Sequence, residues 1–288
     1  MERGRRRTCR DQRGSRPSSL PTATAAGLLR IPRGLSGTGE RLGVLALDAV
    51  SDDRDVGPDV GSGTTFDLQD PEYRAAVVDL LAVLAYGEMS AFERMGADAA
   101  LAPTIADECH LAAMAAAEWR HFEALRDRLT DLGVDPLVAM EPFRAPLNEF
   151  HEHTAPQDWW EGLVKAYVGD GIATDFYREI AQFVDPSTRD LVMQVCDDLG
   201  HSQFVVDQVT AAIAADPTLG GRLALWGRRL VGEALSQAQR VAAQRDALSG
   251  LLVGGVDRPG ADLAEIGRML ARLTDAHTKR MQNLGLGA

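Results

Sequence analysis

The sequence predicts an all-α protein, a four-helix bundle followed by two additional C-terminal helices. From residue 70 onward, hydrophobic residues recur with the spacing of one helix face, in segments of about 25 residues that end near glycine or proline. No segment after residue 70 shows the alternation that is typical of β-strands. Four long helices joined by a short, a long and a short connection are the arrangement expected of a four-helix bundle.

The first helix is predicted over residues 71–96. Asp70 is the expected N-cap, Pro71 occupies the first helical position, and Gly96 lies near the end. Periodicity between proline and glycine boundaries predicts the other helices in the same way. Their expected ranges are 104–132, 157–184 and 187–215 for the bundle (71–215 in all), with a long connection over 136–156, and then 220–249 and 260–284 for the additional helices.

Residues 1–65 are predicted to form a disordered N-terminal extension of the helical domain, residues 66–288. They are rich in Arg, Gly, Ser and Pro and show little hydrophobic periodicity. The Arg-rich start resembles a transit peptide in composition, but a secretory hydrophobic region and cleavage site are missing, so no signal peptide is predicted. A start codon assigned too far upstream explains the segment equally well.

Charge is unevenly distributed along the chain, whose net charge is -12. The central part, residues 43–219, is strongly acidic, whereas residues 220–288 are mildly basic. A basic surface attracts nucleic acid and an acidic one repels it, so the charge pattern permits a nucleic-acid partner without arguing strongly for one. The three cysteines form no CxxC pair, and no apolar run approaches the ~18 residues that span a bilayer. We therefore expect a cytoplasmic protein without a structural disulfide.

Each predicted bundle helix places one carboxylate on its hydrophobic face, near its middle. On the second and fourth helices a histidine follows three residues later, and residues at this spacing share one helix face. All of these side chains are therefore expected to point into one bundle interior. The predicted metal ligands are Glu88, Glu118, His121, Asp170, Asp198 and His201.

Positive charge is needed among these carboxylates, because burying each of them alone would cost several kcal/mol. No lysine or arginine lies on the four hydrophobic faces. Two divalent metal ions would supply the charge, with carboxylate oxygens bridging them and a histidine nitrogen on each. A structural polar network is the competing interpretation.

Other polar residues of the region are not predicted as metal ligands. Glu93 is the main rival of Glu88 as a ligand but is expected to be solvated, as are Asp175 and Asp197. Tyrosines near the site are expected to pack in the core, with lining the site or accepting a radical as the alternative: Tyr86, Tyr167 and Tyr177. Four histidines lack partners at ligand spacing and are not expected to bind metal: His110, His151, His153 and His277.

Residues 71–215 resemble the ferritin-like di-iron superfamily. Three runs, residues 85–94, 117–122 and 167–171, more narrowly resemble a bacterial group described as similar to the tRNA 2-methylthio-N6-isopentenyladenosine hydroxylase. The resemblance implies a di-iron centre, with manganese or a mixed metal pair as alternatives, held by the six ligands named above. It also implies that the centre activates dioxygen and hydroxylates an unactivated carbon–hydrogen bond.

The sequence departs from the superfamily pattern at two ligands. The pattern has Glu on the third helix and Glu-x-x-His on the fourth, where this chain has Asp170 and Asp198-x-x-His201. Aspartate is one methylene shorter, so its carboxylate reaches less far toward a metal. A ferritin-like metal-binding protein without hydroxylase activity, and an enzyme that handles peroxide or superoxide, are therefore alternative functions.

The hydroxylase interpretation implies further partners. Dioxygen and an electron donor are required by the reaction, and a homodimer is a further candidate assembly. Gly169, Gly171 and Gly200 either leave room beside the metals or let helices approach closely. Five arginines of the fifth helix either contact RNA phosphates or form a solvated face, which is slightly favoured: Arg222, Arg228, Arg229, Arg240 and Arg245.

Overall fold

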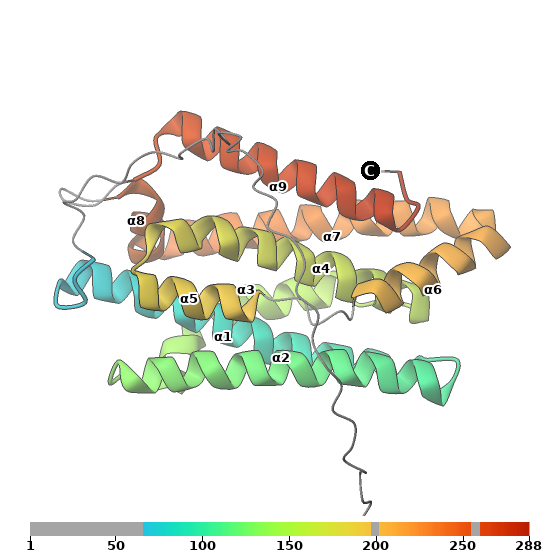
Figure 1. The fold of residues 1–288 in the computed structure, drawn as a ribbon, viewed down its shortest axis with the longest axis horizontal. Coiled ribbons are helices and arrows are strands. Elements are labelled where there is room, and N and C mark those ends of the chain that lie inside the picture. The colour runs from blue at the N-terminus through green and yellow to red at the C-terminus, as the bar shows by residue number, and fades with distance from the viewer. Residues whose placement is uncertain (1–65, 197–201, 255–259, 288) are drawn as a thin grey trace, which may run out of the picture. The chain divides into compact units, whose positions relative to one another are not determined.

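The computed structural model describes residues 66–196, 202–254 and 260–287, all of which belong to one compact unit, Gly57–Ala288. These residues form helices α1–α9 and contain no strand, which confirms the predicted all-α class (Figure 1). The predicted N-terminal extension, residues 1–65, lies outside the described residues.

Four helical segments form the bundle that the sequence predicted. They are α1 (Pro71–Ala99), α2 (Ile105–Asp131), α4 (Trp159–Ile180) and the pair α5 (Pro186–Val195) and α6 (Ser202–Ala215). Helix α1 packs along α2, while α4 contacts α1, α5 and α6 (Figure 1). A short 3-10 turn, η1, extends α4 toward α5.

The same dipeptide, Asp-Pro, begins four of the described helices. In α1, α3 (Pro136–His153), α5 and α7 (Pro217–Gln244), the aspartate accepts a hydrogen bond from a backbone N–H of the first turn. Proline at the first helical position costs nothing, since its missing N–H would have had no partner inside the helix. The predicted roles of Asp70 and Pro71 are confirmed.

Helix α3 occupies most of the segment 136–156, where a connection was predicted. Pro142 and Pro146 lie inside it, and an interior proline removes a helical hydrogen bond. Burial compensates for this loss, because Met140, Phe143 and Pro146 are buried where α3 packs on α1 and α7. A helix therefore forms where a connection was predicted, because tertiary packing compensates for the interior prolines.

The fourth bundle helix, predicted as continuous over residues 187–215, is divided. Helix α5 ends at Val195 and α6 begins at Ser202. The backbone carbonyl of Cys196 accepts a hydrogen bond from Arg178 Nη2 at 2.7 Å, so a side chain occupies the acceptor that would continue the helix. Residues 197–201, which include the predicted ligands Asp198 and His201, lie outside the described residues.

The C-terminal helices cover the bundle on the side away from α2 (Figure 1). Helix α7 contacts α3, α4 and α6, whereas α8 (Asp246–Val253) contacts α1 and α9 (Leu263–Asn283) contacts α4. The predicted helix 220–249 therefore corresponds to α7 and the start of α8, and the predicted helix 260–284 corresponds to α9.

Of the five arginines predicted either to contact RNA or to form a solvated face, Arg228 and Arg229 are exposed and the other three bind other helices. Arg222 pairs with Asp158 and Glu161, which belong to the start of α4. Arg240 pairs with Glu149 of α3. Arg245, at the end of α7, pairs with buried Asp79 of α1. These contacts fix α7 on the bundle, and they occupy guanidinium groups that were candidates for RNA phosphates.

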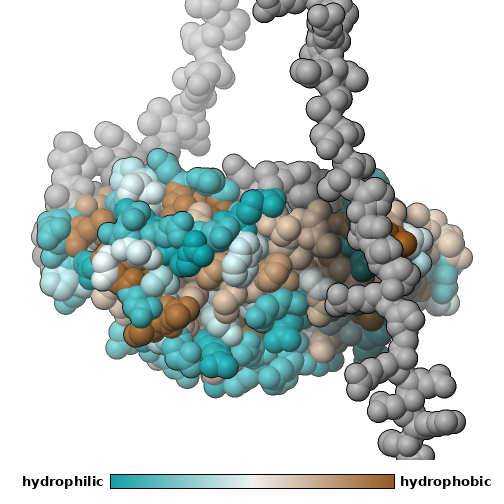
Figure 2. All heavy atoms as spheres, turned by 90° about the horizontal axis from the view of Figure 1, so that it is seen from below, coloured by the Kyte–Doolittle hydropathy of each residue, from teal (hydrophilic) through white to brown (hydrophobic). Residues whose placement is uncertain are grey.

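Helix α1 is long and apolar enough to cross a membrane by length and composition alone. However, 61% of its most apolar window is buried inside the fold, as expected for a core helix. The surface on the α2 side is mostly hydrophilic, with separate hydrophobic patches (Figure 2). The most exposed large hydrophobic residues are Ile105, Leu137 and Val138, which begin α2 and α3, and Val253, which ends α8.

Candidate metal centre

Three of the predicted ligands lie together at the interface of α1 and α2. Candidate ligand atoms of Glu88, Glu118 and His121 all lie within 4.8 Å of one another. His121 Nδ1 is 3.4 Å from Glu88 Oε2 and 3.7 Å from Glu118 Oε2. Both carboxylates are buried, and the imidazole is partly exposed. The helical periodicity of α1 and α2 therefore placed these side chains correctly.

The environment of Glu88 opposes its negative charge. Burial raises the pKa of Glu88 well above its ordinary value, and a hydrogen bond with Glu118 raises it further. The negative charges of Glu118 and Asp170 act in the same direction. Two buried carboxyl groups that are hydrogen-bonded to each other must share a proton, since a carboxylate can only accept. The cluster is therefore short of positive charge.

Asp170 lies beside this cluster without belonging to it. It contributes to the walls of the same cavities as Glu118, and its charge influences Glu88. However, its side chain is exposed, whereas Glu88 and Glu118 are only 6% and 7% exposed. The structure therefore places the third predicted carboxylate at the edge of the site rather than in its buried centre.

A cavity of about 230 Å³ opens beside the cluster, between α2, α4 and α9. Glu118 and His121 form part of its wall, together with Asp170 and Gly171 from α4. The residues that flank the gap at 197–201 also line it, as does a charged residue of α9: Cys196, Ser202 and Arg280. The candidate ligands thus have direct access to a space that can hold a small group.

A second cavity, of about 120 Å³, lies on the α3 side of Glu88 and Glu118. His151 Nε2 donates to Ser90 Oγ at 3.0 Å, because that hydroxyl donates its own proton to the carbonyl of Gly87. Burial and the charges of Lys165 and Arg94 lower the pKa of His151 to about 3. Burial also lowers the pKa of Lys165 to about 8. His151 is thus neutral and is held away from the ligand cluster.

Comparison with known proteins agrees with this architecture. Residues 71–255 match the family described as "Ferritin-like domain, actinomycetes". The chain belongs to this family. No curated protein sequence matches the chain significantly.

The fold of this ferritin-like domain also matches a solved structure, titled "Protein 19 with aldehyde deformylating oxidase activity from Synechococcus". The two chains are 21% identical, with a TM-score of 0.59. The match covers 77% of this chain and 95% of the other. At this level of identity the likeness describes the fold.

The residues of the ferritin-like domain fit a divalent metal. Carboxylate oxygens and an imidazole nitrogen are ligands that iron, manganese and zinc accept. A cation would replace the proton that Glu88 and Glu118 share and would offset the charge that raises the pKa of Glu88. No lysine or arginine of the described residues forms an ion pair with Glu88. The ionisable partner of Glu88 is His121, which is positively charged only when protonated, whereas a divalent cation would offset the carboxylate charge in either state of the ring.

The structure also shows where the other polar residues of the region lie. Glu93, the rival of Glu88, is exposed. None of the other described histidines joins the cluster: His110 stacks on Phe204, His153 pairs with Glu233, and His277 is buried on α9. The prediction for Asp175 was wrong, because this side chain is paired with Arg280 rather than solvated. Asp197 lies outside the described residues.

The three tyrosines near the site differ in their surroundings. Tyr86 is buried and donates to Asn148, as expected of a core residue. Tyr167 lies on the wall of the larger cavity, and Tyr177 on that of the smaller one. Burial, followed by the charge of Glu88, raises the pKa of Tyr177 well above its ordinary value. Tyr177 therefore remains a neutral phenol beside the candidate ligands.

No pattern in the sequence indicates that α9 contributes to the site. Arg280 reaches the cavity wall from more than 100 residues away in the chain and lies on Gly171. Hydrophobic periodicity assigns residues to faces of a helix, but it does not predict which helices become neighbours. Gly171 was predicted either to leave room beside the metals or to let helices approach closely. The side chain of Arg280 from α9 lies against it.

Proposed function

We propose that this ferritin-like protein binds two iron ions and acts as an oxygen-activating hydroxylase. The cluster of Glu88, Glu118 and His121 is the observation that supports this proposal most strongly. Buried carboxylates from two facing helices, with a histidine three residues after one of them, are typical of the metal sites in ferritin-like bundles. The adjoining cavity of about 230 Å³ leaves room for a reacting group next to these ligands.

Bound iron would supply the activation of dioxygen, which no amino-acid side chain supplies. The chain itself provides ligands and, next to them, a space that can hold part of the substrate. Hydroxylation inserts one oxygen atom into a carbon–hydrogen bond and converts the other to water. The balance requires two electrons and two protons from outside the substrate, so an electron donor is a necessary partner.

Asp170, Asp198 and His201 complete the proposed ligand set. Asp170 is close enough to raise the pKa of Glu88 through its charge. Cys196 and Ser202, which flank the undescribed segment, line the same cavity as Glu118. These positions support the proposal that the segment between them contributes ligands from the fourth helix.

A modified tRNA base is the narrower proposal for the substrate, and it rests on the resemblance of residues 85–94, 117–122 and 167–171. The cavity is smaller than the roughly 300–1,000 Å³ pockets that hold whole drug-sized ligands. It would therefore admit a side chain of a base rather than a whole nucleotide. Arg222, Arg240 and Arg245 are already paired within the fold, so the exposed Arg228 and Arg229 are the members of the predicted set that a tRNA could contact.

The test is to load the protein with ferrous iron without oxygen and then admit oxygen. We expect about two irons per chain and the optical absorption of an oxo-bridged ferric pair. Incubation with a reductant and tRNA carrying 2-methylthio-N6-isopentenyladenosine should then add one oxygen atom to the base, detected by mass spectrometry. Iron binding without oxygen reactivity would instead favour the non-catalytic alternative, and an absence of iron binding would exclude both.

A further inference from the structure

Arg280 brings a guanidinium group from α9 to the wall of the larger cavity. Its side chain is only 12% exposed. Arg280 Nη2 donates to Asp175 Oδ2 at 2.6 Å and to the carbonyl of Gly171 at 2.9 Å. By contrast, Nη1 is buried and has no hydrogen-bond partner. A buried donor without a partner is costly and rare, and a ligand in the cavity that Arg280 lines would offer it an acceptor if the guanidinium turned toward the opening.

The backbone of α4 is shaped to receive this side chain. A Cβ atom at Gly171 would lie 2.0 Å from Arg280 Nε and 2.4 Å from its Cζ, so any other residue would displace the guanidinium. Gly171 directly follows Asp170, and both line the cavity together with Glu118. Because position 171 has no side chain, the guanidinium of Arg280 can lie beside the candidate metal ligands.

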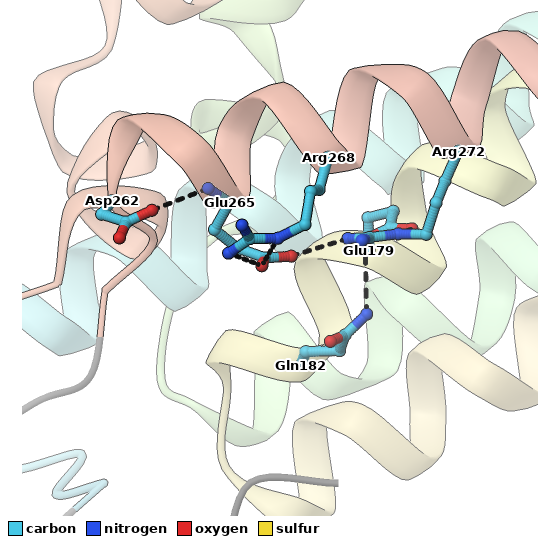
Figure 3. Close-up of polar contacts among 6 residues, drawn as sticks. All are labelled: Glu179, Gln182, Asp262, Glu265, Arg268 and Arg272. Carbon is cyan, nitrogen blue, oxygen red and sulfur yellow. Dashed lines mark hydrogen bonds and ion pairs between the residues drawn. The ribbon is translucent and has the colours of Figure 1, made fainter.

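A separate set of ion pairs holds α9 on α4. Arg272 donates through Nε and Nη2 to the two carboxylate oxygens of Glu179, each at 2.7 Å, and Nη2 also contacts Glu265 at 2.9 Å (Figure 3). Arg272 does not line the cavity. Arg272 thus anchors α9, whereas Arg280 lines the cavity. Substitutions of these two arginines can therefore test the two roles independently.

The charges around the cavity favour an anion once metal is bound. The carboxylates of its wall, Glu118 and Asp170, are proposed ligands whose charge the metal would offset. Arg178 and Arg280 are the cations among the described lining residues. Arg280 Nη1 retains its hydrogen-bond donors, although Asp175 already pairs with Nη2.

We propose that Arg280 binds an anionic oxygen of the substrate, from a carboxylate or a phosphate, and thereby directs the adjoining hydrocarbon part toward Glu118 and His121. This inference rests on the proposed function, because it places the ligand in the same cavity. It goes further by naming the chemical class of the group that is recognised and the residue that recognises it.

The experiment measures binding by calorimetry to the iron-loaded protein and, in parallel, to the metal-free protein. The probes are butanoate, hexanoate and octanoate, the alkyl phosphates of the same chain lengths, and the matching neutral amides. We expect the anions to bind more tightly than the amides. A preference for phosphates would indicate a nucleotide source of the anion, and a preference for carboxylates an organic acid.

Two variants test the role of Arg280. Arg280→Gln should weaken binding of the preferred anion by about 10- to 100-fold, the usual value of a hydrogen bond between charged groups. Gly171→Ala should weaken it in the same direction without removing the charge, because the new Cβ displaces the guanidinium. Arg272→Gln is the matched control, since it removes an arginine of the same helix that does not line the cavity, and it should change affinity less than about twofold.

Each result distinguishes this inference from the proposed function. Iron content and circular dichroism establish that the variants fold and bind metal like the parent protein. Equal anion affinity in the parent and in Arg280→Gln would overturn the inference, because the anions would then bind the metal or another group. Equal affinity for anions and amides would overturn it as well. If the protein binds no iron, the proposed function fails, and the titration of the metal-free protein still decides whether Arg280 binds anions.

Discussion

Two carboxylate clusters of this protein differ in how their charge is compensated. On α1 and α2, Glu88 and Glu118 are buried and hydrogen-bonded to each other, and burial raises the pKa of Glu88. Between α4 and α9, Glu179 and Glu265 both pair with Arg272 (Figure 3). Hydrogen bonds from Arg272 and Arg268 lower the pKa of Glu265. The pKa of Glu88 is raised, whereas that of Glu265 is lowered. The first cluster therefore needs a cation, and the second already has cationic partners.

The two carboxylate clusters also differ in whether they contribute to stability or to function. A carboxylate with an arginine partner stabilises the association of two helices, and removing it weakens the fold slightly. A buried carboxylate without such a partner destabilises the metal-free fold and is retained for another reason. Substitutions in the two clusters should therefore have opposite effects on stability, and only one cluster should affect metal binding.

The largest expected effect is on metal binding by the α1–α2 cluster. Glu118→Ala removes a predicted ligand and should lower iron affinity by more than about 100-fold, since even residues that only support metal ligands are worth 10- to 100-fold. His121→Ala should act in the same direction. Metal analysis after equilibrium dialysis measures the change, and Glu93→Ala, an exposed carboxylate of the same helix as Glu88, is the control that should retain iron.

A smaller effect, a gain in stability, is expected when the buried cluster of the metal-free protein loses a carboxyl group. Glu88→Gln removes a buried carboxyl group and should raise the free energy of unfolding at neutral pH by about 1–3 kcal/mol. Urea denaturation of both proteins without metal measures this difference. Destabilisation would contradict the view that the cluster lacks compensation, and Glu93→Gln should change stability little.

The sign of the pH dependence follows from the same shift. Because the pKa of Glu88 is raised, the folded protein keeps this proton at pH values where the unfolded chain has lost it. Its contribution to stability is therefore fully present below the ordinary pKa of 4.5 and is lost as the pH rises through the folded-state pKa. Glu88→Gln should gain more stability at neutral pH than at pH 4.

The smallest expected effect concerns the α4–α9 ion pairs. Glu179→Gln breaks the contact with Arg272 and should lower the free energy of unfolding by no more than about 1 kcal/mol, because Arg272 is largely exposed. The loss should shrink at high salt, which screens exposed charges. Urea denaturation at low and high salt checks both points. A loss that is independent of salt would show that packing, rather than charge, holds α9 in place.

The local signals in the sequence predicted most helix positions and part of the candidate site. Asp70 and Pro71 begin α1 as expected, and the spacing of Glu88, Glu118 and His121 put them on buried faces. Asp135-Pro136 carries the same start signal for α3, although a connection was predicted there. Such signals act within one or two helical turns, which is why they can be recognised in a single sequence.

Contacts between segments that are distant in the sequence determine the features that local signals do not predict. Arg178 of α4 binds the carbonyl at the end of α5, and Arg245 pairs with Asp79 of α1. Gly171 and Arg280 meet because α9 packs on α4, and no periodicity in either segment predicts that contact. The sequence alone determined most of the helices and most of the faces that they bury. Only the tertiary structure determined which faces meet, because burial of a hydrophobic face stabilises many pairings and the packing of all the helices selects one.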